Sequence, residues 1–452
     1  MTQQKNDESQ IIVNQTIDGQ PADKSSVASK SKVADAPETR RPDPYIWGIY
    51  ITLLIVSVIE LFSASSTEIR GNDVYGPLIR HGIFLAMGLG IVIVFQNIHY
   101  KYFKNLAWVA GIITLGLLIY TMVAGANING AQRAIIIGGI TIQPPEIAKL
   151  SIVLLLSAIM SKHQIPRGID NKGIFLCATV VLLFCAFLIK NGMTNTILIF
   201  GISLAMFLIG GMQLRKVLLI LMIFGAGGAV LYGIKTLTDE QEEEEGIEVV
   251  EESRSRVSTW TNRIQRHFEG VHPEDTIDDY NRQAMYSCFA QANGWIIGRG
   301  PGNSEERARL PLAFSDYIFA IVIEDIGFVG GFCLLALYLF LIARAGRIAS
   351  NCSRAFPAFL IMGCAILIVF QALVHMAITT GVFPVSGQPL PLISKGGTSV
   401  LVMSAAIGMM LSVSRYAVQN GNKKDVKLEL NELPEDMQAA NPTQLTYNDI
   451  KK

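Results

Sequence analysis

Long apolar runs, each about as long as a bilayer is thick, constrain this chain more than any other feature. A helix of roughly 20 apolar residues spans a hydrocarbon core of about 30 Å. About ten such runs recur, at residues 45–65, 79–96, 105–124, 146–161, 174–190, 195–212, 216–234, 317–343, 356–380 and 398–414. Half of the 452 residues are hydrophobic and only 16% are charged. We therefore predict an all-α polytopic membrane protein.

The lysines and arginines of the short connections predict the orientation of the chain. Most lie in one set of alternate connections, and the other set holds little beyond Arg70, Arg133, Lys190 and Lys395. The positive-inside rule places the richer set in the cytoplasm. Residues 1–44 and 416–452 are polar and are predicted to be disordered cytoplasmic tails, flanking a membrane domain at 45–415. Residues 235–315 then form one large extracytoplasmic loop.

The large loop has two parts of different composition. Its acidic run at residues 241–252, QEEEEGIEVVEE, is typical of a solvated surface. From Trp260 onward it mixes aromatic, basic and amide residues, Gln283 among them, which favours short helices lying on the membrane surface. The formal net charge of zero gives no support for a nucleic acid partner.

A first candidate site lies in AQRAIIIGGITIQPPEIAKLS, residues 131–151. Arg133 falls in a connection, and Glu146 and Lys149 follow at i and i+3, so they are neighbours on one helix face. They could form an internal ion pair with no further role. Ionisable groups inside membrane helices more often mark functional sites, and the second interpretation is a cationic phosphate site in which Glu146 orients Lys149.

A second candidate is LPLAFSDYIFAIVIEDIGFVGG, which begins at Leu310. Asp316 is predicted to be the N-cap of the helix that follows, a position that is also accessible for catalysis. Glu324 and Asp325 lie roughly 12 and 13 Å further along that helix. They are too deep to be caps, so we expect them to be paired or to face a polar cavity.

A third candidate is GVFPVSGQPLPLISKGGTSVLVMSAAIG, residues 381–408. Irregular backbone at membrane depth is tolerated only where it lines a cavity or is buried in protein. The segment could present N–H and hydroxyl groups to an anionic ligand at a helix N-terminus, from Ser394, Gly396, Gly397, Thr398 and Ser399. The alternative is a re-entrant turn that serves packing only. The SASS at residues 63–66 more simply serves close packing.

These motifs together resemble the SEDS family (shape, elongation, division and sporulation), and most of all its cell-division members. The matching pieces are SASS, Arg133 with QPPEIAK, the SDYIFA…EDIGF run, and FPVSGQPLPLISKGGTS followed by MSAAIGMML. The resemblance implies a peptidoglycan glycosyltransferase that polymerises lipid II at the outer face of the bacterial cytoplasmic membrane. It also implies a class B penicillin-binding transpeptidase and other divisome proteins as partners, at the division septum.

The resemblance also implies roles for individual residues. The family's essential aspartate falls on Asp316, which would be the general base. Its charged pair falls on Glu146 and Lys149, and its later acidic pair falls on Glu324 and Asp325, as structural residues of the cavity. Arg133, Gln283 and Lys395 would bind substrate. The sequence departs from the family pattern at Pro145, Gly192, His375 and Lys395.

The expected chemistry needs a base for the acceptor hydroxyl and positive charge for the leaving diphosphate. No metal-ligand spacing is present, so a divalent cation, Mg²⁺ or Mn²⁺, is permitted by the sequence but not indicated by it. Three alternatives remain open: a lipid II flippase or other transporter, an elongation-type polymerase, and a non-catalytic scaffold for the transpeptidase.

Overall fold

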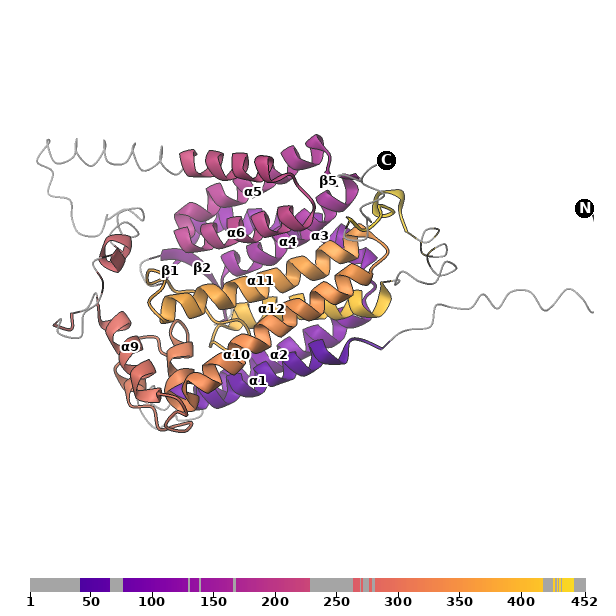
Figure 1. The fold of residues 1–452 in the computed structure, drawn as a ribbon. Helices are drawn as coiled ribbons and strands as arrows, with labels where there is room; N and C mark the ends of the chain where they lie inside the picture. Colours follow the sequence, from indigo (N-terminus) through magenta and orange to yellow (C-terminus); the bar gives the residue numbers. More distant parts are fainter. Residues whose placement is uncertain are drawn as a thin grey trace, which may run out of the picture. The chain divides into compact units, whose positions relative to one another are not determined.

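The computed structural model describes residues 41–65, 76–128, 131–137, 140–165, 168–227, 263–268, 270, 276–278, 281–417, 426, 429, 431 and 433–442. All of them belong to one unit of the chain, and residues 1–39 lie outside the described part. The described residues are overwhelmingly helical (Figure 1), which confirms the predicted fold class. The acidic run at 241–252 lies outside the described residues.

The helices are α1 Pro44–Ser65, α2 Gly76–Asn97, α3 Lys101–Ala124, α4 Pro144–Lys162, α5 Asn171–Asn191, α6 Met193–Ile209, α9 Arg282–Gly294, α10 Ile318–Asn351, α11 Ala355–Thr379 and α12 Gly397–Tyr416. Two short 3-10 helices are η2 Glu306–Ala308 and η3 Glu435–Met437. The strands are few: β1 Ala126–Ile128, β2 Ala131–Ile137 and β3 Ile140–Ile142 form one antiparallel sheet, and β4 Gln164–Ile165 pairs with β5 Gly168–Ile169.

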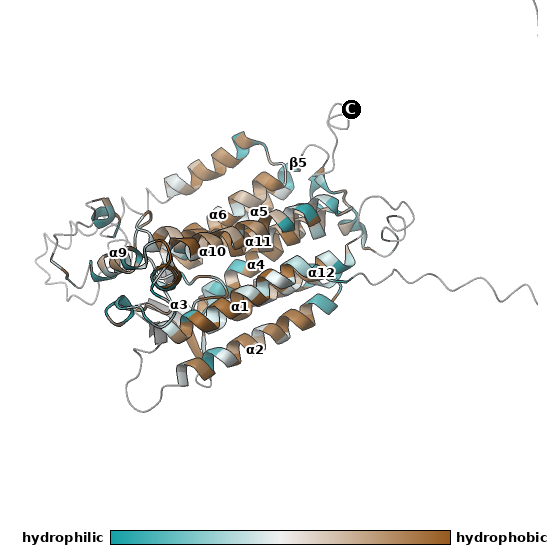
Figure 2. Cartoon of the chain, turned by 60° about the horizontal axis from the view of Figure 1, so that its bottom comes forward, coloured by the Kyte–Doolittle hydropathy of each residue, from teal (hydrophilic) through white to brown (hydrophobic). Residues whose placement is uncertain are grey.

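Eight of the helices in the described part are long and apolar enough to cross a membrane, namely α1 to α5 and α10 to α12. The shorter α6 is also apolar. Residues 214–227 are helical as well and continue into residues outside the described part, so the run predicted at 216–234 is seen only in part. Figure 2 shows the apolar residues along the middle of the helices and the polar ones gathered toward their ends.

Helix α4 lies at the centre of the bundle. In its most apolar window 94% of the residues are buried, against 22% for α2 and 28% for α3. It packs against α3, α5, α6, α11 and α12. Such contacts depend on small residues: a Cβ added at Gly408 of α12 would lie 3.2 Å from the Cα of Val92 in α2. The candidate residues on α4 are therefore buried on all sides.

The bundle has two ends that differ in what covers them. Helix α9 and residues 295–317 lie at one end, which we call the loop end (Figure 1). The connections at residues 98–100, 163–170 and 352–354 lie at the opposite end. The candidate residues Asp316 and Glu324 belong to the loop end.

The C-terminal segment differs from the predicted disordered tail. Residues 433–442 pack on the end opposite the loop end, where Asn441 Nδ2 donates to the carbonyls of Ala349 and Cys352 at 2.8 Å each. The Ala355 N–H donates to the carbonyl of Ala439 at 3.0 Å, and Leu433 and Met437 are buried. The polar composition of the segment did not predict this docking, because two apolar side chains and a few backbone hydrogen bonds are enough to dock a short segment.

Candidate functional site

Asp316 lies in a turn at the loop end, just before α10. The prediction that it caps this helix is wrong: α10 begins at Ile318, Tyr317 occupies the N-cap position, and no side chain caps the helix. The Asp316 N–H donates to the carbonyl of Leu312 at 3.0 Å. Its carboxylate lies against Gly387, where an added Cβ would be 2.9 Å from Oδ2. The carboxylate therefore faces the irregular segment 381–396, which the sequence had singled out separately.

An arginine from the large loop reaches the same segment. Arg263 Nη1 donates to the carbonyl of Val385 at 3.1 Å, two residues before Gly387. The charges of Arg263 and Asp316 both act on the Tyr317 hydroxyl, and burial, followed by the Asp316 charge, raises the pKa of that hydroxyl. A carboxylate, a guanidinium and a buried phenol thus gather here. Sequence reasoning missed Arg263, because only the mixed composition around it was informative.

The segment 381–396 is fastened to the turn that carries Asp316. Ser394 Oγ donates to the carbonyl of Ser315 at 2.7 Å, and the Lys395 N–H donates to the carbonyl of Phe314 at 3.0 Å. The Lys395 ammonium also lies over the Phe314 ring, 4.4 Å from its centroid. The two irregular segments therefore hold each other in place, and Lys395 packs on the turn that contains Asp316.

The start of α12 uses several of its polar groups internally. Gly396 is the N-cap and Gly397 the first helical residue. Thr398 Oγ1 donates to the carbonyl of Thr141 at 2.9 Å and accepts from the Gln143 N–H at 3.2 Å. Ser399 Oγ is buried and has no hydrogen-bond partner in the part of the chain that the structure describes. Of the three predicted hydroxyls, those of Ser394 and Thr398 are thus already engaged by the protein.

The ionisable pair on α4 is closed to solvent. Lys149 Nζ donates to Glu146 Oε1 at 2.6 Å, and the two residues are 0% and 3% exposed. Lys149 Nζ also donates to Gln371 Oε1 at 2.6 Å, and Gln371 Nε2 donates to the carbonyl of Pro389 at 2.9 Å. A polar chain therefore connects α4 through α11 to the segment that faces Asp316. Sequence reasoning missed Gln371, although a lone amide inside the apolar run 356–380 was a usable signal.

A second polar chain runs beside the first. His375 Nδ1 lies 2.7 Å from the carbonyl of Gln388, and Gln388 Nε2 donates to Asn195 Oδ1 at 3.1 Å. All three side chains are buried. Because both chains end on residues 388–389, the backbone directly after Gly387 is fixed by side chains from α6 and α11.

Two other predicted residues lie elsewhere. Arg133 falls on strand β2, not in a simple connection, and its side chain is outside what the structure describes. Gln283 is half-buried on the first turn of α9. This helix is held against α11 by Ser287 Oγ, which donates to the carbonyl of Thr379 at 2.7 Å.

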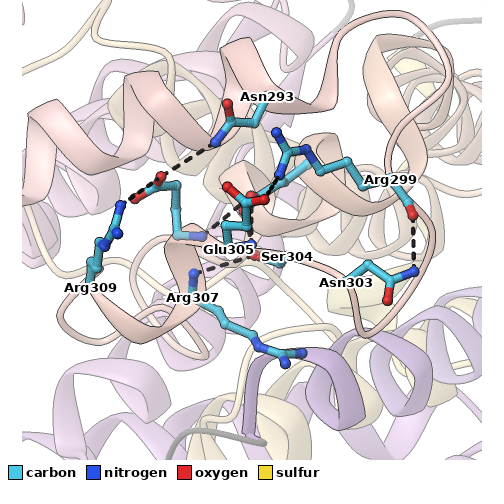
Figure 3. A network of polar contacts seen from close by, with 9 residues as sticks. Asn293, Arg299, Asn303, Ser304, Glu305, Arg307 and Arg309 are labelled. Carbon is cyan, nitrogen blue, oxygen red and sulfur yellow. Dashed lines mark hydrogen bonds and ion pairs between the residues drawn. The ribbon is translucent and has the colours of Figure 1, made fainter.

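Glu324 fastens the loop that precedes Asp316. Its Oε1 accepts from the N–H groups of Glu305 and Glu306 at 2.9 and 3.3 Å, at the start of η2, and Oε2 accepts from Ser304 Oγ. Around it, Arg299 pairs with Glu305, and Glu306 accepts from Asn293 Nδ2 at 3.3 Å (Figure 3). Glu324 is thus a paired acid whose partners are backbone N–H groups.

Helix α10 is broken directly after this pair of acids. Gly327 has φ 77° and ψ 179°, a conformation open to glycine. The gap is filled by residues 295–300: the Arg299 N–H donates to the carbonyl of Glu324 at 2.9 Å, and the Phe328 N–H donates to that of Trp295 at 2.8 Å. Glu324 and Asp325 therefore lie under this loop.

An apolar pocket of about 220 Å³ lies next to the Asp316 contact. Its walls come from α6, α11 and the start of the irregular segment, and include Leu198, Phe370, Leu373, Phe383, Pro384 and Ser386. Ser386 directly precedes Gly387, so the backbone that lines the pocket continues into the residue against which the Asp316 carboxylate lies. Among the described residues no three or more His, Cys, Asp or Glu side chains gather as a metal site would require.

Comparison with known proteins places these features in a family. Residues 44–419 match the sequence model of the FtsW, RodA and SpoVE family, described as cell cycle proteins. A protein of Enterococcus hirae named probable peptidoglycan glycosyltransferase FtsW is 28% identical over 403 residues, which cover 87% of this chain and 97% of the relative. Stage V sporulation protein E of Bacillus subtilis is 27% identical over 84% of this chain and 99% of its own.

Solved structures show the same fold. A chain from a peptidoglycan synthase complex that coordinates polymerization and crosslinking superposes with a TM-score of 0.61, at 23% identity, over 83% of this chain and 98% of its own. The rod shape determining protein RodA of Thermus thermophilus gives a TM-score of 0.57 at 21% identity, over 84% of this chain and 98% of its own.

Proposed function

Because this chain belongs to the FtsW, RodA and SpoVE family of cell cycle proteins, we propose that it is a peptidoglycan glycosyltransferase that polymerises lipid II. The observation that carries the mechanism is the Asp316 carboxylate, set against Gly387 beside an arginine and an apolar pocket. An acid at this place can act on the sugar of a lipid-linked substrate whose chain lies in the membrane.

Asp316 is the general base of the proposed reaction. The 4-hydroxyl oxygen of the acceptor sugar attacks the anomeric carbon of the donor, and the bond from that carbon to the diphosphate oxygen breaks. The hydroxyl proton passes to the Asp316 carboxylate, and the electron pair leaves with the lipid diphosphate. Proton transfer of this kind contributes about 10²–10⁴-fold to the rate.

Cations beside Asp316 stabilise the leaving diphosphate. Lys395 packs on Phe314 of the turn that contains Asp316, and Arg263 reaches the segment next to Gly387. Lys149 is 0% exposed, and its ammonium group donates hydrogen bonds to Glu146 and Gln371. We therefore assign Lys149 a positioning role, which acts through Gln371 on the backbone carbonyl of Pro389. The diphosphate charge would also draw Mg²⁺ or Mn²⁺ as a counterion, which would add Lewis-acid stabilisation.

The apolar pocket between α6 and α11 suits the first part of the polyprenyl chain. Its walls are almost entirely aliphatic and aromatic, and Ser386 at its edge precedes the glycine that touches Asp316. A chain in this pocket would hold the diphosphate near Lys395 while the sugars extend over the loop end.

The proposed function also implies an orientation in the membrane and protein partners. We propose that the loop end faces outward and that both termini are cytoplasmic, with the protein at the division septum. A class B transpeptidase would place its single helix on the exposed apolar face of α10, which carries Phe328, Val329 and Phe332. Large lipid-facing helix surfaces of this kind offer docking faces.

The test is polymerisation of lipid II by the purified protein with its transpeptidase partner, with glycan length read on a gel. Wild type should make polymer and Asp316→Asn should not, while both bind the partner equally. Polymer of normal length from Asp316→Asn would overturn the base assignment. Movement of labelled lipid II across vesicles by both proteins, without polymer from either, would favour a transporter.

A further inference from the structure

Glu60 is a buried acid on α1 for which the proposed reaction has no use. Its side chain is 0% exposed, and neither carboxylate oxygen has a hydrogen-bond partner in the described part of the chain. The ionisable neighbour whose charge acts on it is Asp325 of α10. Asp325 is 1% exposed, and the Ser63 hydroxyl and the Gly302 N–H interact with its carboxylate. The charge of one buried acid thus acts on a second buried acid of a neighbouring helix, and α1 packs against α10.

The polar groups around the pair act on Asp325. Ser63, one turn after Glu60, accepts from the Gly302 N–H at 2.9 Å, and both groups lie beside Asp325. Arg307 Nη1 donates to the carbonyls of Ser63 and Gly302 at 3.1 and 2.6 Å, so its charge reaches Asp325. The charge that acts on Glu60 is that of the Asp325 carboxylate. The two carboxylate oxygens of Glu60 thus have no hydrogen-bond donor among the described residues.

A single shared proton does not satisfy this arrangement. Two carboxyl groups present four oxygens. One shared proton makes only one of them a donor, so other oxygens remain acceptors without a hydrogen-bond partner. Buried polar atoms without partners cost free energy and point to an ion or water. A cation bound by both carboxylates would engage the oxygens of both acids at once. Ligands that are all oxygen select hard cations such as Mg²⁺ or Ca²⁺, and Mg²⁺ is commonly held by one or two carboxylates with water.

We propose that Glu60 and Asp325 together bind one divalent cation of the Mg²⁺ or Ca²⁺ class, which joins the end of α1 to α10 and to the loop around Gly302. The remaining ligands are water and backbone oxygens, since no third acidic, His or Cys side chain joins the pair in the described residues. The site takes no part in the proton transfer assigned to Asp316. Its effect is to stabilise the loop end, because a ligand that binds only the folded state favours that state.

The experiment uses the full chain in lipid nanodiscs, stripped with chelator and then titrated with Mg²⁺, Ca²⁺ or Mn²⁺. Thermal unfolding should shift upward by about 5 °C at saturating cation. Electron paramagnetic resonance of Mn²⁺ should show one tightly bound ion per chain. Glu60→Gln and Asp325→Asn should each lose both the shift and the bound ion.

Two controls separate this site from other acids. Glu305→Gln removes an exposed acid of the same loop, and Asp316→Asn removes the proposed base; both should keep the shift and the bound ion. If Asp316→Asn lost the bound ion while Glu60→Gln and Asp325→Asn kept it, the cation would lie at the reaction site and the proposal would be overturned. The proposal would also be overturned if the unfolding midpoint of wild type did not change with added cation and Glu60→Gln were as stable as wild type. Glu60 would then be protonated in the folded protein.

Discussion

The carboxylate of Asp316 lies against Gly387, and a Cβ at position 387 would lie 2.9 Å from Oδ2 and 3.5 Å from Cγ. The two residues are 71 positions apart in the chain, and one comes from the turn before α10 while the other comes from the segment before α12. The acid is therefore positioned by backbone, and the residue opposite it must be the smallest one.

Gly387→Ala should lower polymerisation strongly while leaving the fold intact. The added methyl would push the carboxylate away, and displacements of about 1 Å in a catalytic group can cost about 10²-fold in rate. Turnover of lipid II is the measurement. Gly116→Ala is the matched control, because an added Cβ there meets nothing within 4 Å. Equal turnover in the two variants would show that the contact does not position Asp316.

Lys149→Ala should destabilise the protein, because it leaves the Glu146 carboxylate buried without its cation. Breaking a buried pair from one side costs about 3–5 kcal/mol. Lys149→Arg should retain more activity than Lys149→Ala, since a cation is kept. The double variant Lys149→Met with Glu146→Gln should recover much of the stability, and thermal unfolding in detergent measures this.

The outcome at position 149 also tests its role in the reaction. If the double variant folds but does not polymerise lipid II, the chain through Gln371 to the carbonyl of Pro389 is needed for catalysis. Full activity in the folded double variant would show that the pair serves stability alone.

Glu324→Ala should release the loop that contains η2, whereas Glu324→Gln should hold it better. Gln keeps an oxygen for the N–H groups of Glu305 and Glu306, and removing it leaves buried donors that cost about 1–3 kcal/mol. Hydrogen exchange at residues 304–308 is the measurement, and it should speed up most in the Ala variant. Unchanged protection in Glu324→Ala would mean that other contacts hold the loop.

The helices of this protein could be predicted from the sequence because membrane spans depend on local composition. The pairing of Glu146 with Lys149 followed from helical spacing for the same reason. Contacts between distant segments left no such local trace. The approach of Arg263 to Val385, and of Gln371 to Pro389, depends on tertiary packing. The break at Gly327 lies in a continuous apolar run, so no local pattern indicated it or the loop that fills it.

His99 should make the protein less stable as pH falls. It lies in the connection between α2 and α3, with its ring 4.6 Å from that of Tyr100 and 5.0 Å from that of Tyr416. Burial, and then the nearby charge of Lys101, lowers the pKa of His99 from 6.5 to about 4. The unfolded chain therefore takes up this proton first. Stability contributed by the neutral ring is present above pH 6.5 and is lost as the pH falls toward 4.

His99→Phe keeps an aromatic ring between the two tyrosines and removes the titrating group. The unfolding midpoint of wild type should drop more steeply between pH 6.5 and 4 than that of the variant, because the wild-type unfolded state binds one more proton per chain. Thermal unfolding over this range, followed by fluorescence in one detergent and one salt concentration, measures the two slopes. Parallel slopes in the two proteins would contradict the assignment, since the pH dependence would then arise from other groups.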